Sequence, residues 1–402
     1  MRPGPGAPGA RRVHEVPSHR RRIAGADRSG PGPAGPCARP GRGARTRITQ
    51  SRSPSPRPTR HHGAVSHSDR SDEMPPLAHD DIKAATDRIA GRVRPVAVVP
   101  TGPGETAEGW VPPGRQVFLA LEFMQHTGSF KARGAQNFLQ AHREAGTLPD
   151  VGVTIASGGN AGLACAWAAR QQGVPATVFL PATAPAVKVA RLRSYGAEVR
   201  LVGTEYAEAQ AACAEFAAAT GALASHAYDH PLIAAGAGTL LEEIRARVPG
   251  LDTVVVAVGG GGLYAGVATA ARHHGIRTVP VEPLHCRALG AAVEAGRPVD
   301  VTVDSVAADS LGARRATAMA LHAARQDGAR PLTVPDDGIV RARQELWDHH
   351  RLAVEHAAAT AYAAVLPSPD TGESLVEGER IAVVLCGANT DPGDLTGQSR
   401  TS

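Results

Sequence analysis

Lys131 is the residue of this sequence best suited to covalent chemistry. The chain contains 43 Lys plus Arg, yet only Lys83, Lys131 and Lys188 are lysines. A desolvated lysine can lose its proton and attack a carbonyl carbon, whereas the guanidinium of arginine stays protonated. Lys131 ends the segment Gln-His-Thr-Gly-Ser-Phe-Lys, which makes it a candidate nucleophile or base. Considered alone, a solvated lysine on a helix would be the more common interpretation.

A run of four glycines provides a second chemical signal. Gly259, Gly260, Gly261 and Gly262 stand between an apolar strand-like run and a helix-like stretch. Backbone N–H groups in such a turn lie beside the positive end of the helix dipole, where a phosphate binds well. A flexible tight turn is the alternative. The pattern differs from G-x-x-x-x-G-K-[ST], so a nucleoside triphosphate is not expected.

Two further strand ends carry small and polar residues. The segment Ser157-Gly-Gly-Asn160-Ala-Gly again opens a helix-like stretch, and its polar side chains suit a carboxylate, with ordinary N-capping as the alternative. The apolar run 381–385 leads into Cys386-Gly-Ala-Asn-Thr. Ligands of open α/β sheets gather at the carboxyl ends of strands, so these segments are expected to share one site.

Short β-branched runs alternate with Ala-rich stretches from about residue 79 onward. Buried strands are predicted at residues 151–156, 176–180, 198–202, 253–258, 278–282 and 381–385. Helices are predicted at residues 160–172, 186–195, 231–248 and 263–273. This alternation predicts an α/β fold of parallel sheets with helices on both faces.

A reactive lysine, a phosphate cradle, a carboxylate cradle and a weakly polar group at a strand end together describe a pyridoxal phosphate site. The sequence resembles the fold type II pyridoxal phosphate enzymes (tryptophan synthase β-like), and within them the serine/threonine dehydratases, over roughly residues 85–392. The matching motifs occur in the family's order: Thr-Gly-Ser-Phe-Lys-Ala-Arg-Gly-Ala (127–135), Ser-Gly-Gly-Asn-Ala-Gly (157–162), Lys188 with Tyr-Gly-Ala-Glu-Val (195–199), Tyr-Asp-His-Pro (228–231) with Gly-Ala-Gly-Thr (236–239), the tetraglycine, Val-Glu-Pro (281–283) and Cys-Gly-Ala-Asn (386–389).

The resemblance implies how the cofactor would be held. Lys131 would bind it as an imine, Phe130 would pack near its ring, and Asn160 would hydrogen-bond its phenolic oxygen. The tetraglycine would hold its phosphate. Cys386 would face the pyridine nitrogen, where relatives carry Ser or Cys.

The resemblance also implies a substrate site. Ser157, Asn160 and the backbone at Ala161 would bind the substrate carboxylate. Gly158 stands where racemase relatives carry a second serine, which disfavours racemisation. Glu282 matches an acid of the family's cation site, and a monovalent cation bound there is left open.

The reaction implied is β-elimination on L-threonine or L-serine to give 2-oxobutanoate or pyruvate plus ammonia, with Lys131 as general base. A neutral thiol at Cys386 does not force protonation of the pyridine, which suits elimination. Two alternatives stay open. One is another fold type II activity on a β-substituted amino acid, by replacement or elimination. The other is a non-catalytic pyridoxal phosphate binder whose basic arm binds nucleic acid.

The expected organisation has two domains and an arm. A small domain at 120–230 would carry Lys131 and close on a large domain built from 79–119 and 231–396, with the cofactor between them. A homodimer is expected from the resemblance alone. Histidine pairs at 273–274 and 349–350 lack partners at metal-ligand spacing and are expected on the surface.

Residues 1–78 differ in composition from the rest of the chain. Residues 1–73 contain 15 Arg and no Lys against five acidic residues, while the whole chain has a net charge of +5. This Arg-, Pro- and Gly-rich arm is predicted to be disordered. It is interpreted as a start codon placed too early, with Met74 near the true beginning, as a nucleic-acid-binding arm, or as a transit peptide.

Apolar runs and cysteines bear on the compartment. No apolar run approaches the roughly 20 residues of a membrane span, and the five cysteines include no C-x-x-C pair. We therefore expect a cytoplasmic protein with no membrane partner.

Overall fold

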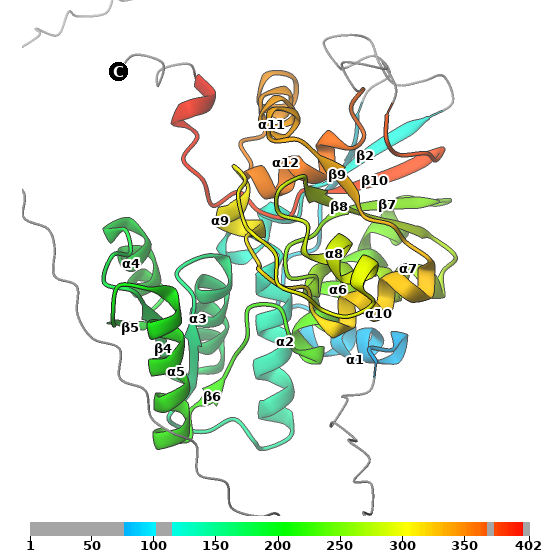
Figure 1. Cartoon of the computed structure of the whole chain (residues 1–402). Coiled ribbons are helices and arrows are strands. Elements are labelled where there is room, and N and C mark those ends of the chain that lie inside the picture. The colour runs from blue at the N-terminus through cyan, green and yellow to red at the C-terminus, as the bar shows by residue number, and fades with distance from the viewer. Residues whose placement is uncertain (1–75, 102–114, 368–373, 397–402) are drawn as a thin grey trace, which may run out of the picture. The chain divides into compact units, whose positions relative to one another are not determined.

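Two sheets flanked by helices make up the described part of the chain (Figure 1). The computed structural model describes residues 76–101, 115–367 and 374–396. Residues 1–75, and with them the prediction of a disordered arm and its three interpretations, lie outside this part. Within the described ranges, no helix is long and apolar enough to cross a membrane.

The larger sheet has six strands in the order β1-β2-β10-β7-β8-β9. All neighbouring pairs are parallel except β1 with β2. Its strands are β1 (Val98–Pro100), β2 (Gln116–Ala120), β10 (Arg380–Val384), β7 (Thr253–Ala257), β8 (Arg277–Pro283) and β9 (Leu332–Val334). The last strand along the chain, β10, thus lies between β2 and β7. All of β7 is buried, as its continuous apolar sequence predicts.

The smaller sheet has four parallel strands in the order β5-β4-β3-β6. They are β5 (Glu198–Leu201), β4 (Ala176–Leu180), β3 (Val153–Ala156) and β6 (Leu223–Ala224). The six strands predicted from the sequence are all present, with ends that differ by at most two residues. The alternation of strands and helices therefore confirms the predicted α/β class.

Helices connect the strands of both sheets. They are α1 (His79–Ile89), α2 (Lys131–Glu144), α3 (Asn160–Gln172), α4 (Ala186–Ser194), α5 (Tyr206–Thr220), α6 (Pro231–Arg247), α7 (Gly262–His273), α8 (Ala288–Ala295), α9 (Ala308–Leu311), α10 (Ala318–Asp327), α11 (Asp336–His350) and α12 (His356–Ala363). Short 3₁₀ turns η1 (Glu122–Met124) and η2 (His126–Gly128) precede α2. The start of α6 follows from its sequence, because Pro231 occupies the first turn and His230 Nδ1 accepts a hydrogen bond from Leu232 N at 3.1 Å.

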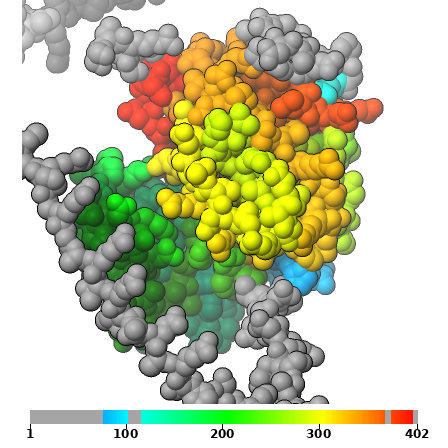
Figure 2. All heavy atoms as spheres, in the orientation of Figure 1, coloured from blue at the N-terminus to red at the C-terminus, as the bar shows by residue number. Residues whose placement is uncertain are grey.

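Helices that flank one sheet contact helices that flank the other. Helix α6 packs against both α2 and α7, and α1 packs against α6. Lys188 of α4 pairs with Asp309 of α9 at 2.8 Å. In the space-filling view, green and yellow segments meet at the surface (Figure 2). The described residues belong to one compact unit, and the predicted domain boundaries at 120 and 230 stay a prediction.

Candidate functional site

The segment before Lys131 pairs with the segment that contains Cys386. Ser129 and Gly387 form an antiparallel bridge. Phe130 N donates to Cys386 O at 3.0 Å, and Ala388 N donates to Gly128 O at 3.0 Å. Two motifs that are distant in the sequence are therefore held together by the backbone at the end of β10.

Lys131 is the first residue of α2 and is half-buried. Its Nζ donates to Ala227 O at 2.8 Å and lies 4.7 Å from the centroid of the Phe130 ring. Burial lowers the pKa of Lys131 to about 8, against the opposing influence of the nearby Cys386 and Glu355 side chains. A lysine with this pKa is partly neutral near pH 7, which is the form that can attack a carbonyl or accept a proton.

Arg133 fixes the first turn of α2 from the interior. Its side chain is fully buried, with Nε 2.7 Å from Glu122 Oε1 and Nη1 2.6 Å from Glu243 Oε1. Glu122 lies in η1 and Glu243 in α6, so this ion-pair triad links three elements around the lysine. Removing one partner of a buried ion pair is strongly destabilising, because the other charge is left unpaired.

The tetraglycine segment brings the N-terminus of α7 close to the lysine. A Cβ at Gly260 would lie 2.2 Å from the ring of Tyr228, so only glycine fits. That ring lies 5.8 Å from Lys131 Nζ, measured to its centroid. No side chain caps the start of α7. The N–H groups of such a first turn have no partner within the helix and suit an anion.

The 157–162 segment folds tightly over the start of α3. A Cβ at Gly162 would lie 1.9 Å from Ser157 O, which excludes every other residue type there. Ser157 is half-buried, Ala161 lies in the first turn, and the cap residue Gly159 has no side chain. The N-terminus of α3 thus presents its backbone N–H groups beside one hydroxyl, an arrangement that can bind a carboxylate.

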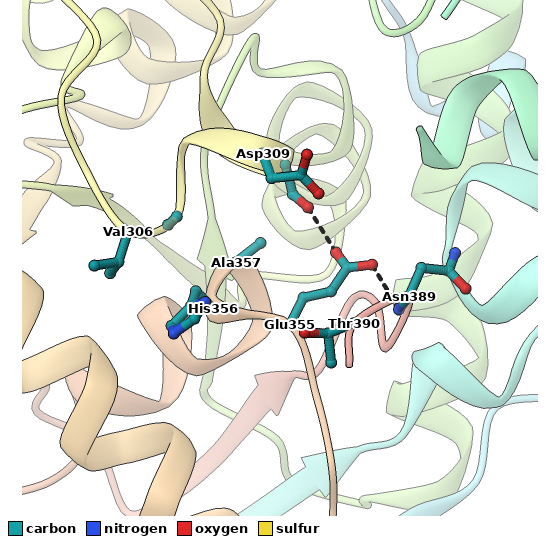
Figure 3. A pocket seen from close by; sticks show the side chains of 9 residues that line it. Val306, Asp309, Glu355, His356, Ala357, Asn389 and Thr390 are labelled. Carbon is teal, nitrogen blue, oxygen red and sulfur yellow. Dashed lines mark hydrogen bonds between the residues drawn. The ribbon is translucent and has the colours of Figure 1, made fainter. Parts of the chain in front are cut away.

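Glu355 is a residue of this region that the sequence analysis missed. Asn160 Nδ2 donates to both of its carboxylate oxygens at 3.0 Å. Asn389 N and Ser310 Oγ also donate to Glu355, at 2.7 and 2.8 Å (Figure 3). Asn389 Nδ2 in turn donates to Asn160 Oδ1 at 2.6 Å. Glu355 therefore fixes the orientation of the Asn160 amide.

A pocket opens beside Glu355. Figure 3 shows its lining: Val306, Ala307, Asp309, Ser310, Glu355, His356, Ala357, Asn389 and Thr390. In the sequence Glu355 is a single acid before an Ala-rich stretch, and that was the only signal that could have identified it.

Two hydroxyls near Lys131 are buried without a hydrogen-bond partner in the described residues. They are Thr127 Oγ1 and Ser129 Oγ. Buried polar atoms normally have partners, so orphans next to a candidate site indicate a ligand. Thr127 also has a left-handed backbone, with φ of 64°, and its carbonyl accepts from Asn389 Nδ2 at 2.8 Å. These orphans, the buried amine and the uncapped α7 fit a polar phosphate-bearing aldehyde such as pyridoxal phosphate.

Cys386 and Glu282 occupy different environments. Burial and the charge of Glu355 raise the pKa of the Cys386 thiol to about 12, so this thiol is neutral at pH 7. Glu282 is fully buried at the end of β8, and burial raises its pKa to about 7. Its two oxygens accept from Leu289 N at 2.7 Å and Gly290 N at 2.8 Å, which caps α8. A monovalent cation at Glu282 stays a prediction.

Comparisons with known proteins agree with this geometry. Residues 98–387 match the model of the family described as pyridoxal-phosphate dependent enzyme. The rat (Rattus norvegicus) protein named serine dehydratase-like is 37% identical over 69% of this chain and 86% of its own length. The L-threonine ammonia-lyase of Geobacter sulfurreducens is 35% identical over 78% of this chain and 76% of its own length.

A solved structure has the same fold. The structure of maize serine racemase superposes with a TM-score of 0.72 at 28% identity, over 80% of this chain and 97% of the racemase chain. The predicted fold type II architecture and its cofactor class are thereby confirmed. The chain belongs to the family of pyridoxal-phosphate-dependent enzymes.

Proposed function

We propose that this protein is an ammonia-lyase that converts L-threonine to 2-oxobutanoate and L-serine to pyruvate, releasing ammonia. The observation that carries the proposal is the half-buried Lys131, whose pKa desolvation lowers to about 8. Its segment is paired to that of Cys386, next to two uncapped helix N-termini. The names of the rat and Geobacter relatives support the same reaction class.

Pyridoxal phosphate would be held by residues that lie next to both sheets. Lys131 would bind it covalently, the backbone at 259–262 would bind its phosphate, and Phe130 would pack near its ring. The Cys386 thiol would face its ring nitrogen as a neutral group. The bound cofactor supplies an electron sink that acidifies the Cα–H bond of an attached amino acid.

The substrate carboxylate would bind at the start of α3, to Ser157 Oγ, the Asn160 amide and the N–H of Ala161. The Asn160 amide nitrogen already donates to Glu355, and its oxygen accepts from Asn389, so the substrate carboxylate would have to take the place of Glu355 at that nitrogen.

Lys131 would move the proton of the reaction. Its neutral amine would accept the α-proton as the Cα–H bond breaks. The Cβ–O bond would then break, and the Lys131 ammonium would return that proton to the departing hydroxyl, which leaves as water. The unsaturated amino acid that leaves the enzyme becomes an imino acid. Its hydrolysis consumes one water and releases ammonia, so the net products are one keto acid and one ammonia. The neutral thiol of Cys386 supports elimination, because it does not stabilise a protonated ring.

Racemisation is the second candidate, favoured by the fold of maize serine racemase. It requires an acid or base on the face opposite Lys131. Gly158 provides no side chain there, and a Cβ at this position would lie 2.8 Å from Leu180 Cδ2. We propose that elimination therefore exceeds racemisation, which chiral analysis of unreacted serine would test.

The domain division at 120 and 230, a homodimer and a cytoplasmic location are also proposed. The described cysteines are free and buried, which supports a reducing compartment. Sedimentation of the cofactor-loaded protein would test the dimer.

The decisive experiment records an absorbance spectrum before and after L-threonine or L-serine is added, followed by a keto-acid assay. Lys131→Ala is the control. We expect a cofactor band that shifts with substrate and a keto acid that only the parent protein forms. A band without keto acid would move the proposal to another β-substituted amino acid. No band after reconstitution would refute catalysis.

A further inference from the structure

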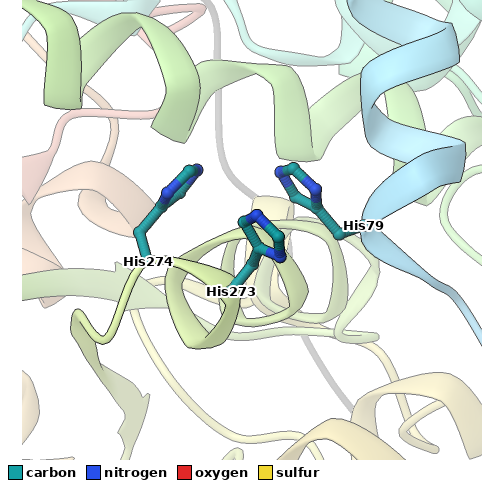
Figure 4. A group of neighbouring side chains, drawn as sticks. All are labelled: His79, His273 and His274. Atoms are coloured by element: carbon teal, nitrogen blue, oxygen red, sulfur yellow. The ribbon is translucent and has the colours of Figure 1, made fainter.

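Three histidines gather on the surface away from the candidate site. His79 is the first residue of α1, His273 is the last residue of α7, and His274 follows it. The nitrogen atoms that they can offer to a metal lie within 4.8 Å of one another (Figure 4). The expectation that His273 and His274 have no partner at metal-ligand distance was wrong, because folding brings α1 against α7.

A carboxylate from a third helix converges on two of these rings. Glu242 Oε1, from α6, lies 2.9 Å from His79 Nε2 and 2.8 Å from His274 Nε2. Arg245 Nη2 contacts the other oxygen, Oε2, at 3.2 Å. One oxygen of Glu242 is therefore directed between two imidazoles.

We propose that His79, His273, His274 and Glu242 form a binding site for a late first-row divalent cation, with Zn²⁺ as the representative ion. Three imidazoles and one carboxylate suit tetrahedral zinc. Magnesium and calcium prefer sites made of oxygen ligands alone, so they should bind poorly. Each coordinating ring would be neutral and carry its proton on the nitrogen that does not face the metal.

The arrangement needs only a local adjustment to close around an ion. With zinc–ligand bonds of about 2.0–2.1 Å, tetrahedral ligand atoms lie about 3.3 Å apart. The contacts of Glu242 Oε1 are already near that separation. The His79 and His273 rings are stacked, with centroids 3.7 Å apart and planes 3° from parallel. His273 is exposed, so it can rotate until its nitrogen points at the metal.

The bound ion would link α1 to α6 and α7. Since these residues do not contact Lys131 or its partners among the described contacts, the site would act on stability and not on turnover. Metal that binds only the folded protein stabilises it by mass action. We therefore expect zinc to raise the melting temperature of the parent protein.

The test uses the full chain without an affinity tag, loaded with pyridoxal phosphate and freed of metal by a chelator. Zn²⁺ is titrated in competition with a chromophoric chelator. We expect one tight equivalent in the parent protein, and affinity at least about tenfold weaker in His273→Ala and in Glu242→Gln. His349→Ala is the matched control, because His349 is also an exposed histidine at the end of a helix. It should bind as the parent does.

Two results would overturn the proposal. One is no saturable zinc binding in the parent protein. The other is equal affinity in the parent, His273→Ala and Glu242→Gln, which would place the metal elsewhere in the chain. Co²⁺ gives a second readout, since a four-coordinate site has intense visible absorption and a weak six-coordinate spectrum would contradict the ligand set. Circular dichroism of each variant checks that it is folded.

Discussion

The rate at which pyridoxal phosphate attaches to Lys131 should report the burial of that lysine. Burial lowers the pKa of Lys131 from the ordinary 10.5 to about 8. At about 1.36 kcal/mol per pH unit, the ammonium form is disfavoured by about 3.4 kcal/mol. At pH 7 roughly one Lys131 amine in ten is neutral, against roughly one in 3,000 for an ordinary lysine.

Only the neutral amine attacks the aldehyde, so the attachment rate should follow its fraction. When cofactor-free protein is mixed with pyridoxal phosphate in a stopped-flow spectrophotometer, we expect the rate to rise almost tenfold between pH 6 and 7 and to level off above about pH 8. A rate that keeps rising beyond pH 9 would refute the burial of the amine.

A charge substitution sharpens this test. The carboxylate of Glu355 holds the pKa of Lys131 above the value that burial alone would give. Glu355→Gln should therefore shift the bend in the rate profile to lower pH. Glu294→Gln, at an exposed glutamate paired with Arg287, is the matched control and should leave the bend in place. Equal profiles for both variants would show that Glu355 does not act on the lysine.

Three other perturbations test the structure around the site. In cofactor-free protein at pH 7, Lys131→Met should raise the free energy of unfolding in urea by about 2 kcal/mol. The substitution relieves about 3.4 kcal/mol of desolvation and loses one hydrogen bond of about 1 kcal/mol. This gain should vanish above about pH 10.5, because the lysine is then neutral in both the folded and the unfolded chain. Gly260→Ala should weaken cofactor affinity at least about tenfold in equilibrium dialysis, because its Cβ would displace Tyr228, whereas Gly338→Ala, whose Cβ has ordinary contacts, should not. Glu122→Gln should cost about 3 kcal/mol in chemical denaturation, since its arginine partner is fully buried, and a loss under about 1 kcal/mol would contradict the importance of the triad.

The sequence predicted the parts of the site whose chemistry restricts the residue type. Lys131 and the tetraglycine could be identified because few residues form imines and only glycine allows the close approach of Tyr228. Helix α3 could be placed from the small residues at its start and Gly173 at its end. These signals are local, so they can be recognised without the fold.

Contacts between distant segments were not predictable in the same way. Glu355 meets Asn160 across the fold, and a single acid before an Ala-rich stretch has no spacing to reveal it. His79 meets His274 only because α1 packs beside α7. Glu282, which the family resemblance connects with a cation, caps α8 in the structure, and its sequence gives no sign of that contact. In each case the partner is set by tertiary packing and not by local sequence.

The position of β10 has a consequence for biosynthesis. Strands β2 and β7 are translated long before β10, yet neither can complete its pairing until residues 380–384 have left the ribosome. During translation both strands expose unpaired backbone edges, which are sites of aggregation. Until β10 is added, each edge is a template on which another chain could pair. The lysine and thiol segments meet only after this insertion, so the cofactor should attach after translation and not during it.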